Sequence, residues 1–206
     1  MHSVETQLHK VSRQGSFSEF LHAHQSPSIA ALAPHGGQVE PNTDLEAELL
    51  RDRLPSTSVW GTRGVTAAGG YNRAFRQWHT TTETHGFEEF PLYQELSGEE
   101  YEVAIGFHGM AREGVVVVGD GNEFLKTDLA ARIDEVIDSE VRVQGVGSEV
   151  DSDNELDVPT DTFTGALDAG ESVHIMQSLE VMTEPEEIVE CVVEWVSESG
   201  GLISTQ

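Results

Sequence analysis

Cysteine, lysine and long apolar runs are all scarce in this sequence. Cys191 is the single cysteine, so the chain cannot close an internal disulfide, and its place in IVECVVEWV predicts a buried side chain. No apolar run approaches the roughly 18 residues that a membrane helix needs. The opening stretch MHSVETQLHKVSRQGSFSEF is polar, so we expect neither a conventional signal peptide nor membrane insertion.

Positive charge is equally scarce. The 206 residues include 11 Lys and Arg, of which only Lys10 and Lys126 are lysines, against 37 Asp and Glu, and the net charge is -26. This balance disfavours nucleic-acid binding through clustered cations, with a local basic site among the arginines between residues 51 and 112 as the alternative. Acidic surfaces poor in lysine are typical of proteins that work in molar salt, where the Debye length falls to about 3 Å. We therefore expect a halophilic archaeon or one of its viruses as the source, with an acidic mesophilic protein as the alternative.

The apolar pattern alternates between strand-like and helix-like segments. Expected strands cover residues 28–33, 57–62, 101–107, 114–119, 140–146 and 171–181, and 76–84 reads as extended; expected helices cover 42–54, 69–75, 88–98, 122–139 and 184–199. Residues 147–162 read as an acidic loop. This alternation predicts a single three-layer α/β domain over 26–206, with a mixed, mostly parallel sheet and helices on both faces. Residues 1–25 show little periodicity and are interpreted as an N-terminal arm, with a short helix as the other reading.

Two histidines follow expected strands. His35 comes two residues after the strand 28–33, and His108 directly follows the strand 101–107. In open α/β sheets, working residues gather at the carboxyl ends of the strands. Glu40 lies on a short tether beyond His35, and two histidines with one carboxylate form the ligand set of a hydrolytic zinc site. Hydrogen-bonded loop histidines remain the alternative on this evidence alone.

The surrounding stretches carry a resemblance. APHGGQVEPNTDLEAELL, WHTTTETHGFEE and VAIGFHGM, within about residues 28–135, resemble the poly-γ-glutamate hydrolase family, with a weaker echo near 172–182. The family's fold and zinc site are similar to those of zinc carboxypeptidases. The resemblance implies that His35, Glu40 and His108 are the zinc ligands and that γ-glutamyl amide bonds are the substrate.

The same fold implies a glutamate on a late strand as general base. Glu180 is the one acid inside the strand-like run HIMQSLEVM and is our candidate, with a solvent-facing surface residue as the alternative. A carboxylate-bearing substrate also calls for arginine, which binds carboxylates in a bidentate manner. Arg63, Arg73 and Arg112 are the candidates, and Arg63 is favoured.

His79 and the glycine-containing stretch at residues 114–124 are interpreted separately. His79 matches a family histidine and is expected to line the cleft or to compete for the metal. GVVVVGDGNEF begins like a dinucleotide site, but Phe124 stands where the third glycine would be, so we expect an ordinary strand-to-helix turn.

These observations lead to one preferred function and two rivals. We expect a zinc-dependent hydrolase of poly-γ-glutamate, acting as a virion-associated or tail-associated depolymerase, located in the virion or outside the cell, with other virion proteins as partners. The rivals are a virion structural or attachment protein that keeps the fold without catalysis, and an enzyme for other amides such as short γ-glutamyl peptides. A cytoplasmic location is the alternative to the virion.

Overall fold

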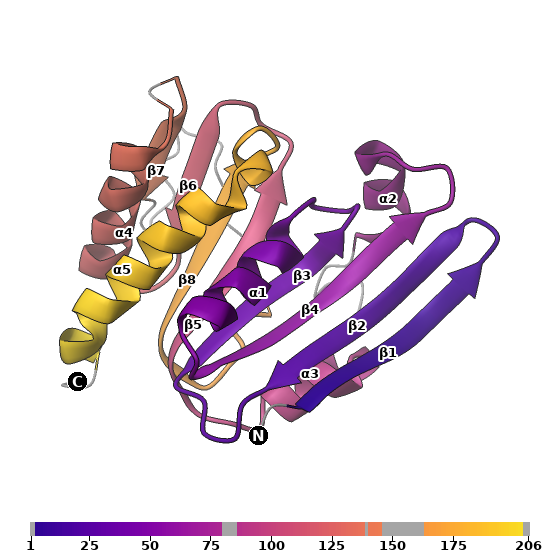
Figure 1. Ribbon diagram of the computed structural model, residues 1–206, viewed down its shortest axis with the longest axis horizontal. Helices are drawn as coiled ribbons and strands as arrows, with labels where there is room; N and C mark the ends of the chain where they lie inside the picture. Colours follow the sequence, from indigo (N-terminus) through magenta and orange to yellow (C-terminus); the bar gives the residue numbers. More distant parts are fainter. Residues whose placement is uncertain (1–2, 80–85, 139, 146–162, 204–206) are drawn as a thin grey trace.

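One eight-stranded mixed sheet forms the centre of the protein (Figure 1). The computed structural model describes residues 3–79, 86–138, 140–145 and 163–203. The strands lie in the order β1-β2-β4-β3-β5-β8-β6-β7. Their bounds are β1 Ser3–Ser12, β2 Gly15–Ala23, β3 Ile29–Gly37, β4 Thr57–Thr66, β5 Tyr101–Met110, β6 Val115–Gly119, β7 Arg142–Gly145 and β8 Ala169–Ser178.

The central strands are parallel, as the sequence predicts. Strands β4, β3, β5 and β8 run parallel to one another, so their carboxyl ends meet at one edge of the sheet. Strand β6 pairs antiparallel with β8 and parallel with β7, and β2 pairs antiparallel with β4. The continuously apolar β6 is an inner strand, in agreement with its sequence.

The N-terminal segment differs from the expected arm. Strands β1 and β2 form an antiparallel hairpin, and β2 continues the sheet along β4 from Gly15 to His22. The reason is the spacing of its apolar residues: Phe17 is buried on one face, Phe20 on the other, and Leu21 again on the first. A strand that buries side chains on both faces of a sheet belongs to the domain core.

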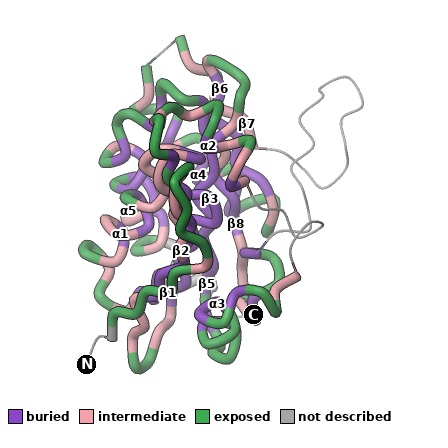
Figure 2. The backbone as a smooth tube through the Cα atoms, turned by 90° about the vertical axis from the view of Figure 1, so that its right-hand side faces the viewer, coloured by how far each residue is buried: buried purple, intermediate pink, exposed green. Residues whose placement is uncertain are grey.

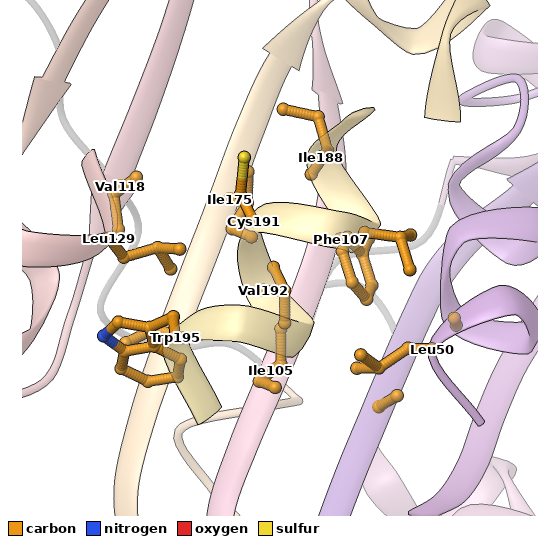
Figure 3. Close-up of a cluster of buried hydrophobic side chains, with 14 of the residues drawn as sticks. Leu50, Ile105, Phe107, Val118, Leu129, Ile175, Ile188, Cys191, Val192 and Trp195 are labelled. Atoms are coloured by element: carbon orange, nitrogen blue, oxygen red, sulfur yellow. The ribbon is translucent and has the colours of Figure 1, made fainter. Parts of the chain in front are cut away.

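Helices cover both faces of the sheet. The bounds are α1 Thr43–Arg53, α2 Tyr71–Trp78, α3 Pro91–Leu96, α4 Glu123–Val136 and α5 Pro185–Ile203, with 3-10 turns η1 Phe87–Glu89 and η2 Val181–Thr183. Helices α1, α4 and α5 lie side by side on one face (Figure 1). The core beneath them contains Leu50, Phe107, Ile175 and Trp195, and Cys191 is buried there as expected (Figure 3).

The opposite face has its own aromatic core. Trp60, Phe90, Tyr93 and Phe163 pack there, with ring centroids of Trp60 and Tyr93 4.9 Å apart. The inner strands are accordingly buried along most of their length, whereas β1 is largely exposed (Figure 2). The sheet between two packed faces confirms the three-layer α/β fold.

Several expected segments differ in detail. Strand β3 runs on to Gly37 and β5 runs on to Met110, so His35 and His108 lie within strands and do not follow them. Residues 76–78 belong to α2, and β8 ends at Ser178. A β-branched composition predicts extended structure for 76–84, but residues 76–78 continue the helical apolar spacing of Ala74 and Trp78, which are both buried. Residues 80–85 and the acidic loop 147–162 lie outside the described residues. No helix in the described ranges is both long and apolar enough to span a bilayer.

Candidate metal site

A tight turn brings Glu40 back to His35. The amide of Glu40 donates to the carbonyl of His35 at 2.8 Å, which closes the turn between them. Gly37 has a φ of 75°, a conformation that glycine adopts without strain, and its amide donates to Asp44 at 3.2 Å. A side chain at Gly36 would meet the carbonyl of Thr62 at 2.7 Å. The two glycines therefore allow the turn, and the five-residue spacing places both functional side chains together.

The Glu40 carboxylate is the centre of a histidine cluster at the carboxyl edge of the parallel strands. Its Oε1 lies 3.1 Å from Nδ1 of His35 and 3.7 Å from Nε2 of His79. Its Oε2 lies 3.8 Å from Nδ1 of His108. The structure thus brings together all three predicted ligands, His35, Glu40 and His108, although their role as ligands stays a prediction.

His79 enters this cluster more closely than the sequence suggested. Ligand atoms of His35, Glu40 and His79 all lie within 4.8 Å of one another. The rings of His35 and His79 have centroids 4.1 Å apart, and Phe75 stacks on the other side of His79 at 4.2 Å. His79 is the residue that directly follows α2, and its match to a family histidine is the signal that singled it out in the sequence.

The electrostatics of the cluster favour a bound cation. Burial alone would raise the pKa of the Glu40 carboxyl, but His35, His79 and His108 together hold it well below its ordinary value. Burial lowers the pKa of His108 to about 4, so this imidazole is neutral and able to act as a ligand at neutral pH. Glu40 Oε2 is buried and accepts no hydrogen bond from the described residues. Imidazole nitrogens and an ionised carboxylate are a donor set that fits zinc.

Another buried histidine, His174, lies next to His108. The rings of His108 and His174 have centroids 5.5 Å apart, and His174 Nε2 lies 3.5 Å from the carboxylate of Asp120. Burial and the neighbouring His108 lower the pKa of His174 to about 3. His174 lies in β8 with 1 % of its surface exposed.

Glu180 lies outside strand β8. It follows the strand end by two residues, its side chain is exposed, and its carboxylate accepts a hydrogen bond from the amide of Gly114. The expectation that Glu180 lies within a strand is wrong, because the apolar residues that continue the run, Val181 and Met182, are buried by a 3-10 turn instead. Within the described residues no contact joins Glu180 to the histidine cluster, and its role as general base stays a prediction.

The three arginines predicted as candidates for substrate binding have different surroundings, and Arg73 is exposed on α2. Arg63 donates to Asp44 at 2.6 Å and to Glu48 at 2.7 Å, and its guanidinium lies over the ring of Phe20 at 4.2 Å. These contacts turn Arg63 toward α1 and do not support its predicted role, because its Nε and one terminal nitrogen already bind carboxylates of the chain. Arg112 is exposed in the turn between β5 and β6.

A buried acid lies near the cluster and escaped the sequence analysis. Glu46 on α1 and Gln177 on β8 are fully buried, and Gln177 Nε2 donates to Glu46 Oε2 at 2.8 Å. Burial raises the pKa of Glu46 to about 8, with Asp44 and Glu40 adding to the rise. When it is neutral, the Glu46 carboxyl carries an O–H group that can donate a hydrogen bond. The neighbouring Gln177 Oε1 is buried and receives no hydrogen bond from the described residues. The only sequence signal for Glu46 is its place in the helical periodicity, which puts it on the core side of α1.

The three-layer fold with a mixed sheet, and a histidine-carboxylate cluster at the carboxyl edge of its parallel strands, define an α/β protein with a candidate metal site. The chain belongs to the poly-gamma-glutamate hydrolase family, whose model matches residues 3–157. A search of curated proteins found no match.

Solved structures agree on the fold. The zinc-free apo form of YndL is 16 % identical with a TM-score of 0.66, and the match covers 96 % of this chain and 90 % of that one. A bacteriophage poly-gamma-glutamate hydrolase is also 16 % identical, with a TM-score of 0.64 and coverage of 97 % and 90 %. A metallopeptidase-type protein from Shewanella denitrificans is 9 % identical, with a TM-score of 0.55 and coverage of 95 % and 84 %.

Proposed function

We propose that this protein is a zinc-dependent hydrolase that cleaves the γ-glutamyl amide bonds of poly-γ-glutamate. The observation that carries the proposal is the convergence of His35, Glu40 and His108 at the carboxyl edge of a parallel sheet in a chain of this family. In this scheme these three residues hold the zinc. The chemistry that zinc would supply there is polarisation of the scissile carbonyl and a lower pKa for water, which would make amide hydrolysis feasible at neutral pH.

The chain must also supply a proton acceptor, and Glu180 is the residue that we propose. It follows β8, the strand beside β5, and so stands at the same sheet edge as His108. Backbone hydrogen bonds, including that from Gly114, lower the pKa of Glu180, so its carboxylate is ionised and can accept a proton at neutral pH. The same carboxyl would then return the proton to the leaving amine.

Substrate carboxylates would meet cations and an imidazole around the cluster. Arg112 extends from the turn that also holds Gly114, the partner of Glu180. Arg73 and His79 lie on and at the end of helix α2. We propose that these residues orient the polyanionic chain, because short-range contacts to arginine survive the screening of molar salt better than long-range attraction does.

The proposed setting is a saline one outside the cell. A net charge of -26 would repel polyglutamate in dilute buffer, and molar salt removes that long-range repulsion. We therefore propose a halophilic archaeal or viral source and a virion-borne depolymerase, in which the enzyme would clear surface polymer for the virus.

Metal analysis of variants tests the proposal directly. Protein purified in molar salt is analysed for zinc and for release of glutamate oligomers from γ-polyglutamate, as wild type, His108→Ala and His79→Ala. We expect about one zinc per wild-type chain, lost together with cleavage in His108→Ala and retained in His79→Ala. Loss of zinc only in His79→Ala would replace His108 by His79 as the ligand. Zinc-free, inactive wild-type protein would refute the hydrolase and favour the structural rival.

A further inference from the structure

Cations that form no ion pair with a described acid gather beside the histidine cluster. Of the 11 Lys and Arg residues, all within the described ranges, five form ion pairs: Arg51, Arg53, Arg63, Lys126 and Arg132. Three of the other six, Lys10, Arg73 and Arg76, are exposed around helix α2. In a chain this acidic, unpaired cations so placed leave positive charge available next to the candidate site.

These cations line two hollows that both include Gln77. The first hollow, of about 900 Å³, is bordered by Arg73, Arg76 and the β1–β2 turn, and reaches Leu179 beside Glu180. The second, of about 320 Å³, is bordered by Lys10 and ends at His79. The shared Gln77 makes the hollows neighbours, and both lie between the β1–β2 hairpin and α2, which Figure 1 shows close together.

The second hollow has an aromatic wall. Phe17 and Trp78 stack with centroids 5.8 Å apart and an interplanar angle of 13°, and Lys10 Nζ lies 5.4 Å from the centre of the Trp78 ring. Each unit of a γ-linked glutamate chain carries two backbone methylene groups and one free carboxylate. An aromatic surface beside an ammonium group matches both parts, because methylenes pack on rings and the carboxylate pairs with the cation.

We propose that these two hollows bind carboxylates from separate units of one γ-linked polyanionic chain, with Arg76 engaging one unit and Lys10 another on the far side of Gln77. This deepens the proposed function and rests on it for the identity of the polymer. The arrangement selects a long chain over a dipeptide, because a dipeptide is too short to occupy both hollows while it lies at the histidine cluster. Glu89 also lines the second hollow and repels a bound carboxylate there.

Binding of end-labelled γ-polyglutamate, measured by fluorescence anisotropy in the presence of a metal chelator, tests this without catalysis. We expect Lys10→Gln and Arg76→Gln each to weaken binding by about three- to tenfold, as for loss of one charged contact. The double variant should show the product of the two factors, and Glu89→Gln should bind more tightly. Arg142→Gln is the matched control, since Arg142 is an exposed arginine on β7, at the other edge of the sheet.

Hydrolysis provides the second measurement. In the enzyme without chelator, Lys10→Gln and Arg76→Gln should each raise KM for long polymer. At least one of the two variants should leave KM for a γ-glutamyl dipeptide unaltered. If Lys10→Gln and Arg76→Gln bind polymer as Arg142→Gln does, the two-hollow proposal is overturned, even if the wild type cleaves the polymer. If the wild type does not cleave the polymer but the two variants bind it more weakly, the two-hollow proposal is supported and the hydrolase function is contradicted.

Discussion

Glu46 is a carboxylic acid that burial keeps neutral. Its pKa of about 8 in the folded protein lies above the ordinary value of 4.5, so the native state holds a proton that the unfolded chain loses. The free energy of unfolding therefore falls as the pH rises from 4.5 to about 8, by up to about 1.4 kcal/mol per pH unit. Below that window both states are protonated, and above it both are ionised, so the contribution of Glu46 levels off.

Glu46→Gln isolates this effect, because glutamine is neutral at every pH and keeps the shape of the side chain. Chemical unfolding of both proteins between pH 5 and pH 9 should show a smaller loss of stability with rising pH for the variant than for the wild type. Parallel pH profiles would contradict a protonated Glu46.

At Gly106 the neighbouring side chains leave no room for a Cβ atom. An added Cβ would lie 2.4 Å from Thr164 Oγ1 and 3.3 Å from His108 Nε2. Gly106→Ala should thus lower the free energy of unfolding by about 1–3 kcal/mol through overpacking. The double variant Gly106→Ala/Thr164→Ala should recover part of that loss, measured by denaturant titration. Equal stability of the single and double variants would show that Thr164 is not the obstacle.

At the scale of elements, Asn42 links the two turns that carry the candidate catalytic groups. It precedes α1 with a φ of 71°, and its Nδ2 donates to the carbonyl of Met182 in η2 at 2.8 Å. Asn42→Ala should destabilise the protein by about 1–2 kcal/mol, because it loses this bond and strains the backbone. Asn42→Gly tolerates the positive φ and should fall between wild type and Asn42→Ala in thermal unfolding. If the two variants are equally stable, backbone strain plays no part.

Local patterns were sufficient to predict most elements and to place His35 and His108 at one edge of the sheet, whereas the choice of ligands rested on the family resemblance. Buried strands are continuous apolar runs, so β3, β5 and β6 are readable, and residues at the carboxyl ends of parallel strands fall on one sheet edge. The hairpin of residues 3–23 was missed because its polar outer strand has no apolar period. The contacts of Arg63 with α1, and of Glu180 with Gly114, depend on tertiary packing between distant segments. A sequence has no local signal for such pairs.

For the whole molecule, the net charge of -26 makes stability depend on salt. Repulsion between like charges weakens as the Debye length shrinks from about 10 Å at 0.1 M to about 3 Å at 1 M. The midpoint of thermal unfolding should therefore rise with KCl and most steeply below about 1 M, where the Debye length changes most. A neutral osmolyte at equal osmolarity controls for water activity. A midpoint independent of KCl would contradict this explanation of the charge.

The position of β8 sets the order in which the chain can fold. This strand comes from the last quarter of the sequence yet lies between β6 and β5, the strand that carries His108. During synthesis β5 must wait with an open edge until residues 169–178 leave the ribosome. Such late, non-local pairing slows folding and leaves an edge exposed to other chains. Nascent chains halted before β8 are thus expected to be the species most prone to aggregate.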